Sequence, residues 1–132
     1  MALTKRIGCV VLRNVNGSLR RTVVTKVESI SDFENTVNTS AKLLVIDYKA
    51  EWCGPCKRMS PLFEEMSNTF DDSCEFLSVD CDDLPELAGQ RGVASLPTFE
   101  FIQNGKALEQ VIGANPAKLE QTIARILEEG PQ

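Results

Sequence analysis

Apolar residues along the chain follow two different periods. Short continuous apolar runs, such as Leu43 to Ile46, are typical of strands that are buried on both faces of a mostly parallel sheet. Apolar residues that recur three and four positions apart, as they do from Met59 to Phe70, instead predict helices with one buried face. The two patterns alternate through most of the sequence, so we expect an α/β protein.

The predicted elements follow each other in the order βαβαβαββα. Val23 to Val27 forms the first strand, and Ser31 with Glu34 has the capping-box spacing that begins the first helix. Asn104-Gly105 predicts a tight turn that makes the last two strands antiparallel. We therefore expect a three-layer α/β/α sandwich around a central mixed sheet. The other predicted strands are 43–47, 76–80, 98–103 and 107–112, and the other helices are one that reaches Phe70, one at 84–90 and one that opens at 115–116.

Pro61 lies inside the apolar stripe of the helix that reaches Phe70. Proline removes one backbone hydrogen bond and clashes with the preceding turn. The helix should therefore bend at Pro61, or else stop near Ser60 and restart.

Two cysteines, Cys53 and Cys56, stand between the strand that ends at Asp47 and the following helix. A thiol at a helix start feels the positive end of the macrodipole and unpaired backbone N–H groups, which favour the thiolate. Two thiols at this spacing can close a disulfide after one of them has attacked a partner. Thiol–disulfide exchange is therefore the expected chemistry.

Half of a zinc site is the alternative interpretation of such a cysteine pair. The sequence has no histidine, and the other cysteines, Cys9, Cys74 and Cys81, form no second close pair, so we expect no metal. Most unpaired cysteines are small buried hydrophobes. Regulatory oxidation or intermolecular pairing of Cys74 or Cys81 is the alternative, and it would require an exposed thiol with a depressed pKa.

The run Trp52-Cys53-Gly54-Pro55-Cys56-Lys57 resembles the active-site signature of the thioredoxin family. The similarity extends from about Thr22 to about Glu129, and the stretch from Phe76 to Asp83 is closer to the eukaryotic branch than to the bacterial one. The resemblance implies the thioredoxin fold. Further landmarks in the family's order are Asp47, Leu96-Pro97-Thr98, Asn104-Gly105 and Gly113-Ala114.

The resemblance also implies an activity, the reduction of disulfides in client proteins for cell redox homeostasis. Cys53 would be the nucleophile and Cys56 the resolving thiol, while Asp47 would take the proton from Cys56. No cofactor would be bound, and electrons would come from NADPH through a flavin-containing thioredoxin reductase. Clients would include peroxiredoxins, and the chain would be a monomer.

A client surface is implied around the cysteines. The Leu96-Pro97 peptide is expected to be cis, and the backbone of Leu96 would pair with a client strand. Trp52 could belong to the core, but we expect it on the surface because aromatic residues anchor interfaces. The apolar rim implied by the resemblance consists of Trp52, Gly54, Pro55, Gly113 and Ala114.

Asp47 closes an apolar run, so burial should raise its pKa. The alternative is a strand-end residue that satisfies backbone N–H groups. Many bacterial relatives have a lysine on the next strand beside this aspartate, and we expect Phe76 at that position here. Lys49 could add positive potential near Cys53, or it could be a solvated lysine at the rim.

Two other functions stay open at this stage. A protein with the same fold could instead catalyse disulfide formation, as an oxidant or isomerase. Gly54-Pro55, which resembles the reductant class, and the lack of a visible secretory signal argue against this alternative. Alternatively, the chain could be a binding module of a larger assembly that uses the groove around Trp52 and Pro97 without turnover.

Charge divides the chain near residue 21. Residues 1–21 contribute +5 and the remaining residues −10, which together give the formal net charge of −5. An acidic domain at 22–132 argues against nucleic acid as a partner. No apolar stretch approaches the roughly 20 residues needed to cross a bilayer, so we expect no membrane insertion.

The basic N-terminal extension, 1–21, lacks acidic residues, a composition that is typical of a mitochondrial transit peptide. Asn16-Gly17 between the runs Cys9 to Val15 and Ser18 to Val24 could instead form the turn of an extra hairpin. A disordered tail is a third alternative. We expect the mitochondrion as the location, with the cytoplasm as the alternative.

Overall fold

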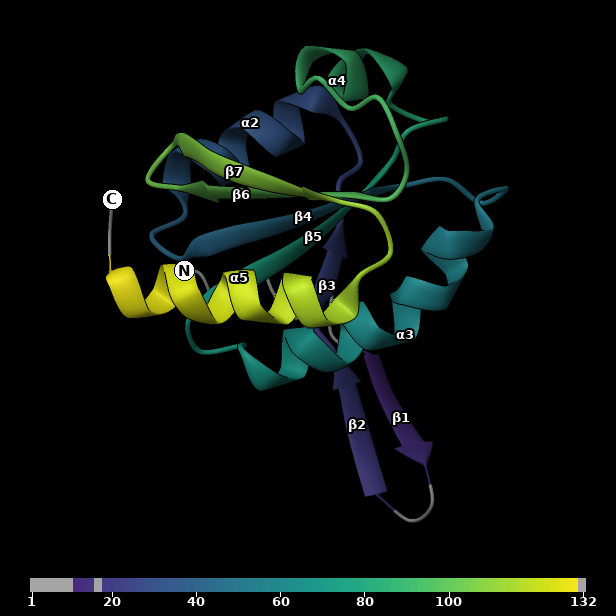
Figure 1. The fold of residues 1–132 in the computed structure, drawn as a ribbon, viewed down its shortest axis with the longest axis vertical. Coiled ribbons are helices and arrows are strands. Elements are labelled where there is room, and N and C mark those ends of the chain that lie inside the picture. The colour runs from purple at the N-terminus through teal and green to yellow at the C-terminus, as the bar shows by residue number, and fades with distance from the viewer. Residues whose placement is uncertain (1–10, 16–17, 131–132) are drawn as a thin grey trace.

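The structure, a computed structural model, describes residues 11–15 and 18–130. Its central sheet has the strand order β3-β5-β4-β6-β7 (Figure 1). β3, β5 and β4 are parallel, whereas β6 is antiparallel to β4 and β7 is antiparallel to β6. The predicted mixed sheet is therefore confirmed. The strands are β3 (Val24–Lys26), β4 (Leu43–Lys49), β5 (Cys74–Asp80), β6 (Thr98–Gln103) and β7 (Lys106–Ile112).

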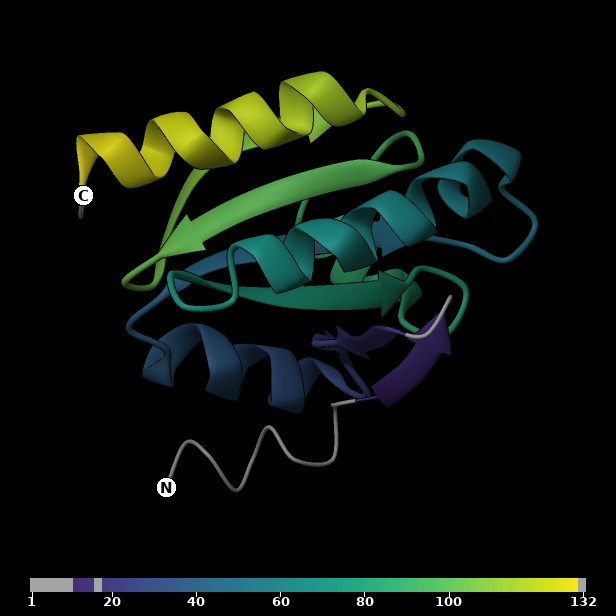
Figure 2. The ribbon, with the colours of Figure 1, turned by 90° about the horizontal axis from the view of Figure 1, so that it is seen from below.

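Helices cover both faces of this sheet. α2 and α4 lie on one face and α3 and α5 on the other (Figure 1), and the view from below shows α3 and α5 in front of the strands (Figure 2). Side chains of β4 alternate between the two layers, with Val45 in the core under α3 and α5 and Ile46 in the core under α2 and α4. The predicted three-layer sandwich is confirmed. The helices are α2 (Ile30–Thr39), α3 (Gly54–Thr69), α4 (Pro85–Gln90) and α5 (Pro116–Glu129).

A separate two-stranded sheet precedes the domain. β1 (Val11–Val15) and β2 (Ser18–Thr22) pair in antiparallel register, and they extend away from the central sheet beyond α3 (Figure 1). These are the strands that the hairpin interpretation predicts, although Val24 belongs to β3. Asn16-Gly17 and Cys9 lie outside the described residues. In the part of the chain that is described, no helix is long and apolar enough to span a bilayer.

The first helix begins two residues earlier than expected. Ser29, not Ser31, is the N-cap, and its Oγ accepts a hydrogen bond from the N–H of Asp32 at 3.0 Å. The carboxylate of Asp32 accepts in turn from the N–H of Glu28 at 3.2 Å. Both serines have an acidic residue three positions later, but a start at Ser29 also brings Ile30 into the helix, where it packs against the core.

α3 runs without a break through Pro61, so the alternative of a helix that stops near Ser60 is wrong. Met59, Phe63 and Met66 are buried, as the spacing predicts. Leu62, in contrast, is exposed. It lies at the edge of the apolar face of α3, where side chains point away from the sheet.

β4 continues past its predicted end at Asp47 as far as Lys49. The extension buries Tyr48, whose hydroxyl donates a hydrogen bond to Glu100 Oε1 at 2.7 Å. Because this partner satisfies the buried hydroxyl, the strand can continue into the interior. The remaining predicted boundaries agree with the structure to within two residues.

Candidate active site

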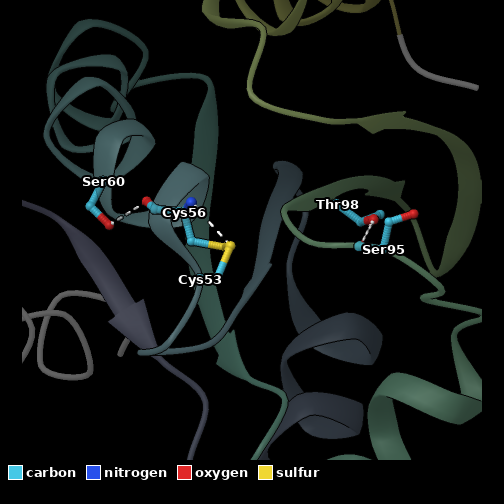
Figure 3. The surroundings of a disulfide bond; sticks show 5 residues. All are labelled: Cys53, Cys56, Ser60, Ser95 and Thr98. Atoms are coloured by element: carbon cyan, nitrogen blue, oxygen red, sulfur yellow. Dashed lines mark hydrogen bonds between the residues drawn. A yellow bond between two sulfur atoms is a disulfide. The ribbon is translucent and has the colours of Figure 1, made fainter.

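The two cysteines of the motif lie at the N-terminus of α3 and are joined in a disulfide (Figure 3). Cys53 is the N-cap, and its Sγ accepts a hydrogen bond from the N–H of Cys56 at 3.2 Å. Pro55 occupies the first turn, where a backbone N–H would have no partner within the helix, so its missing N–H costs no helical hydrogen bond. Both sulfur atoms are therefore held at the positive end of the helix.

Burial alone does not distinguish the two cysteines, because Cys53 is 4% exposed and Cys56 is 2% exposed. Their positions do differ. Cys53 precedes the helix, whereas Cys56 lies inside its first turn and its carbonyl accepts a hydrogen bond from the hydroxyl of Ser60 at 3.2 Å. In the oxidised form the two cysteines therefore differ in their position along the helix and not in their exposure.

A second loop lies beside the cysteines. The peptide between Leu96 and Pro97 is cis, as expected. β6 begins at the next residue, Thr98, which pairs with Tyr48 near the end of β4, so the loop is brought to the edge of the sheet from which the cysteine loop leaves. Leu96 packs against the small buried cluster that Ala50 forms with the two cysteines.

Two hydrogen bonds hold this loop in place. The hydroxyl of Thr98 donates to the carbonyl of Ser95 at 2.6 Å (Figure 3), and the N–H of Gly113 donates to the carbonyl of Pro97 at 2.9 Å. Gly113 has φ 101°, a conformation that favours glycine. The segments at Leu96-Pro97 and at Gly113 are therefore directly linked.

The residues predicted to form the rim lie mostly at the surface, either next to the cysteines in the sequence or, for Gly113 and Ala114, in the segment that is linked to Pro97. Trp52 is 71% exposed, which confirms that it lies outside the core. Gly54 and Ala114 are exposed, while Pro55 and Gly113 are half-buried. Sequence reasoning missed Ile112, which is also largely exposed. Its alternation with the buried Val111 on an edge strand is the signal that could have identified it.

Asp47 is 1% exposed, and burial raises its pKa from 3.8 to about 7, with a smaller lowering by Lys49. Alternation along β4 places it on the same face of the sheet as Val45, towards α3. Its Oδ1 has no hydrogen-bond partner among the described residues. That oxygen therefore does not fit the alternative in which Asp47 satisfies backbone N–H groups.

The register of β4 and β5 defines the surroundings of Asp47 on the next strand. It pairs Asp47 directly with Ser78, whereas Phe76 pairs with Val45. Phe76 therefore lies on the same face of the sheet, two residues before Ser78, and its match to the lysine of bacterial relatives stays a prediction. The cation that acts on Asp47 is Lys49, on the same strand.

The other described cysteines do not have the properties of reactive thiols. Burial raises the pKa of Cys74 to about 12. Burial and the carboxylates of Asp80, Asp47 and Asp82 raise the pKa of the half-buried Cys81 to about 11. Both therefore lack the depressed pKa that regulatory oxidation requires. Among residues 11–15 and 18–130, no group of three or more acidic, histidine or cysteine side chains is placed to hold a metal ion.

Comparison with known proteins gives consistent results. The family model described as Thioredoxin matches residues 23–125. Thioredoxin-1 of Schizosaccharomyces pombe is 46% identical over 101 residues, which cover 76% of this chain and 96% of that protein.

Two solved structures are also similar, each with a TM-score of 0.74 at 34% identity over 78% of this chain and 95% of the other. One is the oxidised form of mitochondrial thioredoxin 3 from Saccharomyces cerevisiae. The other comes from work on the thiol resolving mechanism of yeast mitochondrial 1-Cys peroxiredoxin through the glutathione and thioredoxin systems.

Proposed function

The chain belongs to the thioredoxin family, and we propose that its chemistry is divided between Cys53 as the nucleophile and Cys56 as the resolving thiol. It is a thiol–disulfide oxidoreductase that reduces protein disulfides through this dithiol. The observation that supports the division is the position of Cys53 as the N-cap of α3, with Cys56 inside the first turn.

The reaction has two steps. The Cys53 thiolate attacks one sulfur of the client disulfide, a mixed disulfide forms, and the other client sulfur leaves as a thiolate that takes up a proton. The Cys56 thiolate then attacks Cys53 Sγ, which releases the second client thiol and closes the Cys53–Cys56 disulfide. The client gains two electrons, and the dithiol loses two.

Asp47 is proposed to accept the proton of Cys56 during the second step. Its pKa of about 7 means that the carboxyl can exist in either protonation state near neutral pH. Its Oδ1 is free to bind a proton or a water molecule, since no described residue donates to it. Ser78, its neighbour on β5, is neutral, so Lys49 is left as the cation that opposes the effect of burial.

Clients are proposed to bind on the rim around the disulfide. Trp52, Gly54, Pro55, Gly113 and Ala114 would contact the client, and the backbone of Leu96 would pair with an extended client segment. The packing of Leu96 against the cluster that contains both cysteines supports this arrangement, because a strand paired with Leu96 would run close to the disulfide.

Electrons are proposed to come from NADPH through a flavin-containing thioredoxin reductase, with no cofactor bound to this chain. Peroxiredoxins are proposed as clients, and the similar yeast structure from work on a 1-Cys peroxiredoxin supports this choice. Reduction of such clients would maintain cell redox homeostasis. The chain would act as a monomer, and with its acidic domain it would not bind nucleic acid.

Insulin reduction with dithiothreitol as the electron source tests the direction of the reaction. The wild type should exceed Cys53→Ser, which measures the background. Equal rates would contradict the reductase function. A reduction potential well above the value of about −270 mV quoted for thioredoxin would instead favour the oxidant or isomerase alternative.

We also propose that residues 1–21 are a mitochondrial targeting extension and that 22–132 is the functional domain. The family match, which begins at residue 23, supports this division. The paired strands β1 and β2 favour the alternative of a retained hairpin, with a cytoplasmic location. Mass spectrometry of the protein from its own cells distinguishes the two. A mature N-terminus near Arg21 supports import and cleavage, whereas an intact N-terminus supports retention.

A further inference from the structure

An ion pair with a buried carboxylate and a partly exposed guanidinium lies on the face of the sheet opposite the cysteines. Glu100, in the middle of β6, is 3% exposed, and its carboxylate accepts three hydrogen bonds. Tyr48 Oη and Arg91 Nε donate to Oε1 at 2.7 and 3.1 Å, and Arg91 Nη2 donates to Oε2 at 2.6 Å. The arginine thus binds both oxygens of the carboxylate, which fixes its orientation as well as its distance.

Arg91 connects this pair to the loop that reaches the disulfide. It is the C-cap of α4 and the first residue of the segment that ends at the cis Leu96-Pro97 peptide. Its guanidinium lies over the ring of Phe33, 5.7 Å from the ring centre, and its carbonyl accepts from Gln110 Nε2 at 3.2 Å. The start of the segment is therefore attached to β6, to β7 and to α2.

The rest of the segment transmits this position to the active site. After Gly92, with φ 72°, the side chain of Val93 packs into the core under α2 and α4. Leu96 packs against that same core and also against the cluster that contains the two cysteines. A shift at Arg91 would therefore move Leu96 relative to the sulfur atoms.

We propose that Arg91 and Glu100 are positioning residues for client binding, because their pair holds the 92–97 segment so that the Leu96 backbone is oriented to pair with a client strand. The inference rests on the proposed role of Leu96. Stability alone does not explain the pair, since replacing a buried ion pair by apolar side chains of similar volume is often neutral or stabilising. The bidentate pair instead holds Arg91, and with it the start of the 92–97 segment, in one fixed position.

The test compares Arg91→Met with the double variant Arg91→Met/Glu100→Met. The single change leaves Glu100 without its cation, whereas the double change removes both charges and should restore the melting temperature. If the pair positions the loop, both variants raise the KM for insulin by roughly two- to thirtyfold. The kcat, and the rate with dithiodipyridine, a disulfide too small to pair with Leu96, should be unchanged.

Two control variants sharpen the comparison. Arg125→Met removes an ion pair with Glu109 on the surface of α5 and should leave the KM for insulin unchanged. Tyr48→Phe removes one hydroxyl but keeps the Arg91–Glu100 pair, so it should also leave the KM unchanged.

Three results would overturn the proposal: an unchanged KM in Arg91→Met, a double variant whose KM returns to the wild-type value together with its stability, or equal losses with insulin and dithiodipyridine. The second result would show that the pair acts only on stability, and the third that it acts on the cysteines. A wild type no faster than Cys53→Ser would instead be a failure of the reductase function itself.

Discussion

Asp47 and Tyr48 are consecutive residues of β4, yet they carry buried polar groups into opposite layers of the molecule. Asp47 faces α3, and its Oδ1 has no hydrogen-bond partner among the described residues. Tyr48 faces α2 and α4 and donates to Glu100, which also binds Arg91. A buried polar group without a partner costs free energy, whereas one with partners fixes a geometry. The two faces therefore differ in whether their buried polar groups have hydrogen-bond partners, which is the basis of the two roles proposed for them.

The largest effect should come from the cysteines on the Asp47 face. Without a resolving thiol the mixed disulfide cannot be released within the molecule, so Cys56→Ser should lose turnover and accumulate covalent complexes with clients. Cys53→Ser should trap few clients. Non-reducing electrophoresis of each variant from cell extracts measures the difference. Equal trapping by the two variants would mean that the roles are reversed or shared.

The unpartnered carboxyl of Asp47 should make stability depend on pH. Its folded-state pKa, about 7, lies above the ordinary value of 3.8, so the folded protein holds this proton more tightly than the unfolded chain does. The resulting contribution to the free energy of unfolding is full below pH about 4 and is lost as the pH rises to about 7. The loss amounts to roughly 4 kcal/mol. Urea unfolding of the wild type and Asp47→Asn between these pH values measures it. The variant should lack this decrease, and parallel curves for the two proteins would contradict the assignment.

Breaking the hydrogen-bonded network of Tyr48, Arg91 and Glu100 should also destabilise the fold, in this case because a buried charge loses its partner. Arg91→Met leaves the Glu100 carboxylate, whose side chain is 4% exposed, without its cation. We expect a loss of about 3 kcal/mol at neutral pH, near the lower end for a broken buried pair because the Arg91 side chain itself is 28% exposed. Urea unfolding checks this value. A loss as small as that of Lys26→Met, which breaks an exposed pair with Asp83, would show that the network contributes no special stability.

The smallest effect should come from the edge of the same network. Tyr48→Phe removes one hydrogen bond to Glu100 while the two from Arg91 remain. Because the carboxylate keeps its charged partner, we expect a loss of only about 1 kcal/mol in unfolding free energy. A loss equal to that of Arg91→Met would show that the hydroxyl, and not the cation, is the main partner of Glu100.

The sequence by itself determined the features that depend on a few neighbouring residues. Cys53 and Cys56 could be placed at a helix start because caps, spacing and the apolar stripe are all local signals. The antiparallel turn at Asn104-Gly105 was equally local and is confirmed. The same signals placed one helix start incorrectly, since both Ser29 and Ser31 have an acidic residue three positions later and only packing selects between them.

Only the tertiary structure decided which distant groups meet. The partner of Tyr48 lies 52 residues away, and no local pattern points to it. The strand register, which pairs Asp47 with Ser78 and Val45 with Phe76, depends on how whole strands pack together. Leu96 likewise packs against the cluster that contains the cysteines because β6 pairs with β4. The burial of Asp47 follows from the apolar run that it closes, a local signal, but the pairing of distant groups is a property of the assembled layers, so the partners of the buried polar groups could be known only from the fold.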